Sequence, residues 1–151
     1  MIPATSQRVP LHTRESLNER IRREAELRVE RYRHAPPEEI DRRLAELDRE
    51  WDIERALEAN AATVSLAGLA LGAFVNRKFF AVPAAVSCFL LLHAIQGWCP
   101  PVSGYRRLGF RTEREIDEER QALKIIRGDY RPFVGTNAQP STRELMAAVH
   151  N

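Results

Sequence analysis

Two long uncharged runs lie almost back to back in this chain. Residues 59–75 and 79–105 contain no Asp, Glu, Lys or Arg, and only the tripeptide Asn-Arg-Lys separates them. As helices, residues 59–75 and 79–98 would measure about 25 Å and about 30 Å, the range that crosses the hydrocarbon core of a bilayer. Neither run has a polar face at helical period, and the flanking segments are too polar to wrap both. We therefore predict an all-α membrane protein built on a two-helix transmembrane hairpin, 59–75 and 79–98.

The distribution of basic residues predicts how this hairpin is oriented. A three-residue connection allows only an antiparallel pair, so both termini lie on the same side of the membrane. The turn contributes Arg77 and Lys78, whereas each flank contributes four arginines close to the membrane: Arg42, Arg43, Arg49 and Arg55 before it, Arg106, Arg107, Arg111 and Arg114 after it. Since basic residues are retained on the cytoplasmic side, we expect a multi-pass protein of the bacterial inner membrane with both termini cytoplasmic.

Small and polar residues within the spans predict how the two helices meet. Gly68 and Gly72 are four residues apart, a spacing that allows close helix approach within the hairpin or in a dimer. Residues equally far from the turn lie at similar depth, and polar side chains in lipid usually pair with one another. This predicts an intramembrane polar cluster of Asn60, Thr63, His93 and Gln96. His93 has no second ligand nearby in the sequence, so a hydrogen-bonded histidine is favoured over haem or metal ligation.

The flanks predict charged helices with short apolar stripes. The expected segments are a disordered N-terminus (1–12), an amphipathic cytoplasmic helix (13–35), a coiled-coil-like helix (37–58), an interfacial loop (99–112), an amphipathic cytoplasmic helix (113–127) and a loose tail (128–151). Ile40, Leu44, Leu47 and Trp51 form the coiled-coil-like seam. No Gly or Pro occurs from Ala45 to Leu66, so this helix is expected to run straight into the first span. Thr112 and Glu115 form a possible capping box for the last helix.

The segment after the second span holds the candidate interfacial residues. Trp98, Tyr105, Arg106 and Arg107 are predicted to face the lipid interface, where aromatic rings and arginines are favoured. Cys99 is the candidate thiol, and three interpretations remain open for it. It is a packing residue where the chain leaves lipid, a reactive thiol whose pKa Arg106 and Arg107 lower, or a lipidated cysteine.

Composition and motifs argue against the common functional classes. A net charge of +2 is too small to indicate nucleic-acid binding. Two cysteines, at positions 88 and 99, form neither a disulfide framework nor a metal-binding pair. No Ser-His-Asp set, phosphate-binding loop or zinc-protease motif occurs in the sequence. We therefore predict no enzymatic activity, no cofactor and no catalytic or metal site.

A short pattern at the end of the second span is similar to a known family. Residues 97–100 read Gly-Trp-Cys-Pro and residues 108–112 read Leu-Gly-Phe-Arg-Thr. Over residues 56–112 the chain resembles the YgaP-like inner-membrane hairpin family, a bacterial domain of unknown function with two short membrane helices. The matching residues are Gly97, Cys99, Pro100, Leu108, Gly109, Phe110, Arg111 and Thr112. Some members carry a rhodanese domain before the hairpin, but residues 1–55 contain no cysteine to act as its nucleophile. The resemblance implies an integral inner-membrane protein and gives no support for a sulfurtransferase activity.

Three functions remain open from the sequence. The favoured one is a non-enzymatic scaffold or accessory subunit that holds cytoplasmic helices at the bilayer. Its expected partners are the lipid bilayer and a protein, or a second copy, bound through the cytoplasmic helices. The others are a membrane-bound thiol partner in sulfur or redox handling through Cys99, and a transport element formed by several copies.

Overall fold

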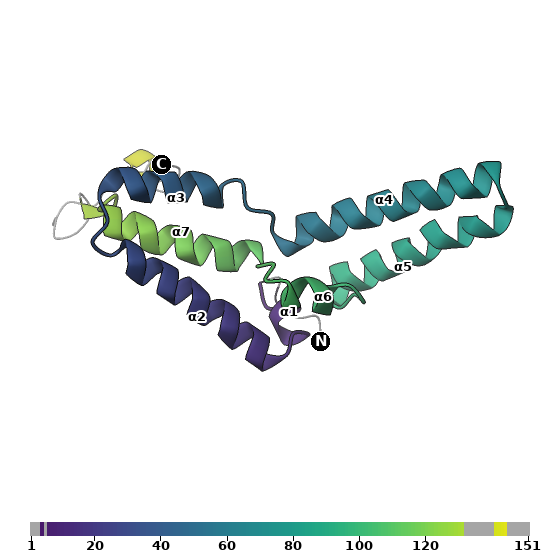
Figure 1. Cartoon of the computed structure of the whole chain (residues 1–151), viewed down its shortest axis with the longest axis horizontal. Helices are drawn as coiled ribbons and strands as arrows, with labels where there is room; N and C mark the ends of the chain where they lie inside the picture. Colours follow the sequence, from purple (N-terminus) through teal and green to yellow (C-terminus); the bar gives the residue numbers. More distant parts are fainter. Residues whose placement is uncertain (1–3, 5, 132–140, 145–151) are drawn as a thin grey trace. The chain divides into compact units, whose positions relative to one another are not determined.

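The computed structural model describes residues 4, 6–131 and 141–144, which form helices and no strands (Figure 1). The predicted all-α class is confirmed for this part of the chain. The helices are α1 Arg8–Leu11, α2 Glu15–Tyr32, α3 Pro37–Leu47, α4 Ile53–Phe74, the 3-10 turn η1 Arg77–Phe80, α5 Ala81–Gln96, α6 Val102–Arg107 and α7 Glu113–Arg127. They fall into two compact units. The hairpin unit comprises Met1–Arg23 and Trp51–Ile116, and the charged-helix unit comprises Glu24–Glu50 and Asp117–Asn151.

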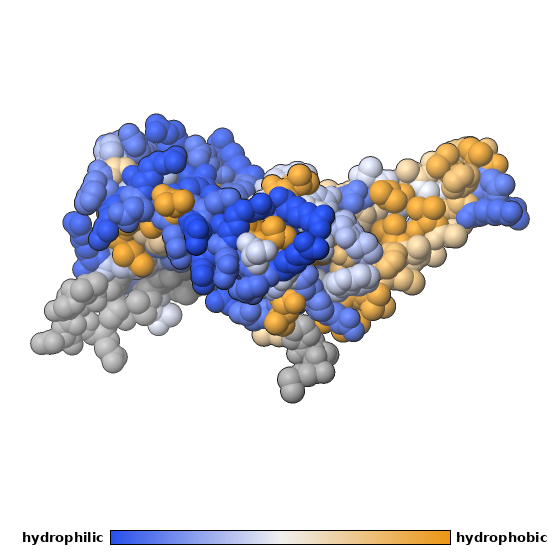
Figure 2. Space-filling model, turned by 60° about the horizontal axis from the view of Figure 1, so that its bottom comes forward, coloured by the Kyte–Doolittle hydropathy of each residue, from blue (hydrophilic) through white to orange (hydrophobic). Residues whose placement is uncertain are grey.

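Helices α4 and α5 form an antiparallel hairpin closed by the single turn η1 (Figure 1). Asn76 begins the turn, because its side-chain oxygen accepts a hydrogen bond from the backbone N–H of Lys78 at 2.9 Å. Ile53–Phe74 and Arg77–Gln96 are each long and apolar enough to cross a membrane. Only 22% of the most apolar stretch of the first, and 6% of that of the second, is buried within the structure. Apolar surface therefore covers the hairpin, with a polar tip at the turn (Figure 2).

Two glycines allow α4 to approach the start of α5 closely. A Cβ atom added at Gly68 would lie 2.9 Å from Pro83 Cδ and 2.9 Å from Val82 Cβ. One added at Gly72 would lie 2.8 Å from the ring of Phe80. Both glycines are buried, so their contacts favour packing within the hairpin over a dimer contact.

The open end of the hairpin, called here the hairpin foot, is closed by α1, α6 and the chain around them. Val9 of α1 is buried in a small apolar core together with Ile53, Leu57, Cys99 and Val102. Gly97 ends α5 with a φ of 81°, a left-handed conformation that glycine adopts without strain. A Cβ atom there would come within 2.3 Å of the Arg8 carbonyl oxygen, so the close approach of α1 also requires glycine.

Two segments predicted to lack regular structure contain helices. The N-terminal residues 1–12 were expected to be disordered, but Val9 is 1% exposed and anchors α1 in the hairpin foot. The interfacial loop predicted at 99–112 contains α6. Pro100 and Pro101 precede α6, and proline is well suited to the start of a helix because the first backbone N–H groups need no helical partner.

The prediction of a continuous helix from residue 37 into the first span is also wrong. Helix α3 ends at Leu47 and α4 begins at Ile53. The reason is Asp52, whose carboxylate caps α4 by accepting a hydrogen bond from the backbone N–H of Arg55 at 2.6 Å. The Ile53 N–H instead donates to the Arg111 carbonyl at 2.8 Å. Trp51 thus leaves the predicted seam, is 48% exposed and stacks under the Arg55 guanidinium at 4.6 Å.

The charged-helix unit is organised around a buried carboxylate. Ile40, Leu44 and Leu47 of α3 are buried, as is Leu123 of α7. Beside them Glu119 is 2% exposed, and it accepts hydrogen bonds from Arg28 Nε at 3.0 Å and Arg43 Nε at 2.9 Å. Two cations compensate the cost of burying this charge.

The loose tail predicted at 128–151 falls mostly outside the described residues.

The glycine contacts predict that two similar substitutions have different effects. In Gly68→Ala the new methyl meets Val82 Cβ and a proline ring, which cannot move without the backbone, and we expect unfolding to become easier by about 1–3 kcal/mol. In Gly72→Ala the methyl meets only the ring of Phe80, which is 44% exposed and can rotate away, so the effect should be small. Thermal unfolding of both variants in detergent measures the difference. Equal melting temperatures would mean that the two glycine contacts are equivalent.

Candidate functional site

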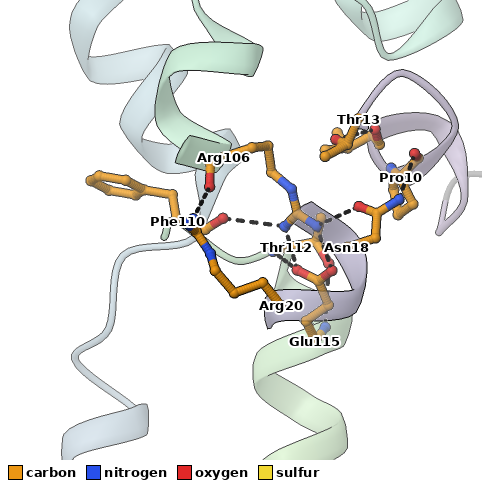
Figure 3. A network of polar contacts seen from close by, with 9 residues as sticks. Pro10, Thr13, Asn18, Arg20, Arg106, Phe110, Thr112 and Glu115 are labelled. Carbon is orange, nitrogen blue, oxygen red and sulfur yellow. Dashed lines mark hydrogen bonds and ion pairs between the residues drawn. The ribbon is translucent and has the colours of Figure 1, made fainter. Parts of the chain in front are cut away.

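The polar residues of the hairpin foot converge on one buried arginine. Arg106, on α6, has no solvent exposure. Its Nη1 donates to Glu115 Oε2 at 2.6 Å and its Nη2 to Glu115 Oε1 at 2.8 Å, a two-pronged ion pair. Nη2 also donates to Asn18 Oδ1 at 2.9 Å and Nη1 to the Phe110 carbonyl at 3.2 Å. Figure 3 shows the side chains of Asn18 (α2) and Glu115 (α7) and the backbone carbonyl of Phe110 pointing toward the guanidinium.

Glu115 is held in place by the start of its own helix. Its backbone N–H donates to Thr112 Oγ1 at 3.3 Å, and its Oε2 accepts from the Thr112 backbone N–H at 2.8 Å. This confirms the predicted capping box. Burial acts to raise the pKa of Glu115, but the hydrogen bonds from Arg106 and Thr112 together with the Arg106 charge outweigh it, so the pKa lies below its usual value.

The same network ties α1 and α2 to α6. Arg20 donates to the carbonyl oxygen of Arg107 at 3.0 Å, which satisfies an open carbonyl at the end of α6. Asn18 Nδ2 donates to the Pro10 carbonyl at 3.1 Å, and Thr13 Oγ1 donates to the Val9 carbonyl at 2.9 Å (Figure 3). These side chains form hydrogen bonds with backbone groups and with one another, so the network holds α1, α2 and α6 together.

The four residues predicted to face the lipid interface lie in different surroundings. Arg106 does not face outward, because Glu115 and Asn18 hold it inside the hairpin foot. Tyr105 is half-buried and packs edge-to-face on Phe110, with ring centroids 5.1 Å apart. Trp98 and Arg107 are exposed.

The predicted intramembrane polar cluster is not formed. Asn60 and Gln96 are exposed, and Thr63 Oγ1 donates to the Ala59 carbonyl of its own helix at 2.7 Å. His93 is buried, and among the described residues neither of its ring nitrogens has a hydrogen-bond partner. The prediction assumed that residues at equal depth face each other, but Asn60 and Gln96 both lie on exposed faces of their helices.

Cys99 lies inside the apolar core of the hairpin foot. It is 6% exposed, and burial raises the pKa of its thiol, which keeps the thiol protonated and unreactive. The Arg106 guanidinium that was considered as an activating charge is engaged by Glu115. This arrangement favours the packing role among the three considered for Cys99. Cys88, on α5, is exposed.

Over the described part of the chain, no group of three or more His, Cys, Asp and Glu residues is placed to hold a metal ion. No family model matches the chain, and no similar protein was found among curated proteins or solved structures. The resemblance of residues 56–112 to the YgaP-like family therefore stays a prediction.

Sequence reasoning missed the polar contacts of the N-terminal segment. Arg8 Nη1 donates to the Ala94 carbonyl at 3.3 Å, and its Nη2 lies 3.7 Å from Glu54 Oε1. The signal present in the sequence was Val9, an apolar residue in a polar segment, which is buried and docks α1. It was too short for helical periodicity to reveal.

The Arg106 network predicts a large difference between two adjacent arginines. Replacing Arg106 by Met leaves the Glu115 carboxylate without its buried partner, and we expect the free energy of unfolding to fall by about 3–5 kcal/mol. The matched control is Arg107→Met, an exposed position where a change within about 0.5 kcal/mol is expected. Chemical unfolding in detergent provides the measurement. A similar loss in both variants would exclude a special role for the buried arginine.

The pKa of Glu115 predicts a dependence of stability on acid pH. The pKa of Glu115 in the folded state lies below 4.5, the value of an unperturbed glutamate. The ion pair therefore contributes fully to the free energy of unfolding above pH 4.5. This contribution is lost as the pH falls through the folded-state pKa. We expect Glu115→Gln to be less stable than the wild type at neutral pH and to lose less further stability on acidification. Parallel unfolding curves across the acid range would contradict this.

Proposed function

We propose that the chain is an integral protein of the bacterial inner membrane that holds a small charged helical unit at the cytoplasmic face, as a non-enzymatic scaffold or accessory subunit. The observation that carries this proposal is the exposed apolar hairpin. Large apolar side chains on both helices are open to the surroundings, among them Leu66, Phe74, Val75, Leu91 and Ile95. In water such a surface would be costly, whereas in lipid it is favourable.

The two units differ in charge in a way that supports this placement. The hairpin unit contains 12 Arg and Lys residues against 7 Asp and Glu, whereas the charged-helix unit contains 11 against 14. Of the basic residues in the hairpin unit, only Arg77 and Lys78 lie at the turn. The excess of basic residues at the hairpin foot supports a cytoplasmic location, where anionic lipid headgroups attract them.

The site geometry supports a structural role more than the other candidate functions. Arg106, Glu115 and Asn18 form hydrogen bonds with one another, as expected of a group that holds chain segments together. Cys99 is buried, which weakens the thiol-partner alternative. A transport element would require several copies, since one hairpin encloses no pore. We place the protein partner, or second copy, on the cytoplasmic helices, where Leu27 and Ile125 are exposed apolar residues.

Labelling of single cysteines tests this topology. In a Cys88→Ala, Cys99→Ala background, one cysteine replaces Asn76 at the hairpin turn and another, in a separate variant, replaces Ser6. With a membrane-impermeant maleimide on intact spheroplasts, we expect labelling at position 76 and none at position 6 until lysis. Labelling at position 6 in intact spheroplasts would reverse the orientation. Release of the protein by alkaline carbonate would show that the hairpin does not span the membrane.

A further inference from the structure

Besides Arg106 Nε, four buried polar atoms in the hairpin foot lack hydrogen-bond partners among the described residues. They are both ring nitrogens of His93, Arg8 Nε and Glu54 Oε2. His93 is only 6% exposed, and the Gly97 backbone nearby falls outside hydrogen-bonding geometry. Buried polar groups are normally satisfied, so a concentration of unsatisfied ones indicates that something polar binds there.

These residues belong to one contact between α1 and the hairpin. Arg8 donates to the carbonyl of Ala94, the residue after His93, and is 3.7 Å from Glu54 Oε1. Gly97 lies one turn after His93, and a Cβ atom added there would come within 2.3 Å of the Arg8 carbonyl oxygen, so α1 packs on the turn of α5 that carries His93. Facing the ring are therefore Arg8 from α1, with Glu54 of α4 behind it, and the backbone of Gly97.

Neutral His93 suits this arrangement and protonated His93 does not. With the imidazole neutral, one cation and one carboxylate balance each other in the site. A proton taken up from water at a ring nitrogen would place a second cation near Arg8, and at this partly buried position the repulsion is screened less than in bulk water. Displacement of Arg8 into solvent relieves that repulsion.

The displacement of Arg8 would also uncover Cys99. Arg8 and Val9 are adjacent in α1, a helix of four residues, and Val9 packs in the same apolar core as Cys99. If α1 leaves, the core loses its cover on that side. We infer that His93, Arg8 and Glu54 form a proton-binding site that controls a latch: protonation of His93 releases α1 and exposes the Cys99 thiol.

Thiol accessibility in nanodiscs tests the latch. Cys88→Ala leaves Cys99 as the single thiol, and 4,4′-dithiodipyridine is the probe because it reacts with thiols at acid and neutral pH. Each rate is divided by that of glutathione at the same pH, which removes the intrinsic effect of thiol ionisation. We expect the corrected rate to rise about tenfold or more between pH 7.5 and pH 5, the factor that corresponds to one pKa unit of coupling.

Three further variants separate the latch from general acid unfolding. His93→Gln, which cannot take up the proton, should remain slow at both pH values. Arg8→Gln keeps a donor for the Ala94 carbonyl but removes the charge, and it should also lose most of the response. His12→Gln changes an exposed histidine just after α1 and should respond as the wild type does. Helix content by circular dichroism shows whether each variant is folded.

The outcomes that overturn the latch are specific. A corrected wild-type rate that does not change with pH excludes it, as does a His93→Gln protein that responds like the wild type. A response that persists in Arg8→Gln would mean that repulsion between the two cations is not the cause. None of these results bears on the membrane topology, which the labelling of positions 6 and 76 tests separately.

Discussion

The buried ion pair between Arg106 and Glu115 is the interaction on which the hairpin foot depends. A guanidinium without solvent exposure is tolerated only because a carboxylate, an amide oxygen and a backbone carbonyl accept its hydrogen bonds together. These acceptors come from Asn18, Phe110 and Glu115. Asn18 is 88 residues from Arg106 in the sequence, so the network joins α2 to the segment that runs from α6 into α7. The open end of the hairpin is therefore closed by polar contacts as much as by its small apolar core.

This arrangement also explains why the foot tolerates a buried cysteine. Val9, Ile53, Leu57, Cys99 and Val102 form a core too small to hold α1, α4 and α6 together by apolar burial alone. The hydrogen bonds of Asn18, Thr13 and Arg20 to backbone carbonyls add directional contacts around it. In such a site Cys99 acts as a small apolar side chain. Its chemistry becomes available only if the surrounding segments move.

The sequence predicted features that rest on periodicity and local rules. The two apolar runs, the last amphipathic helix and the capping box of Thr112 and Glu115 follow from spacing alone. The break between α3 and α4 could have been anticipated from Asp52, since aspartate caps helices more readily than it continues them. The burial of Arg106 and the docking of α1 could not, because both depend on partners distant in the sequence. An arginine next to a predicted span is usually assigned to the lipid surface, and only the fold reveals that Arg106 turns inward.

If the hairpin spans the membrane as proposed, its close glycine contacts have a consequence for bilayers of different thickness. Helices that meet through Gly68 and Gly72 cannot slide past each other without steric clash with Val82, Pro83 or Phe80. A single helix longer than the hydrocarbon core adapts by tilting on its own, whereas this pair would have to tilt as one body. The polar turn at Arg77 and Lys78 would resist entry into lipid as the tilt grew. A mismatch between hairpin length and bilayer thickness would therefore strain the η1 turn and the hairpin foot together.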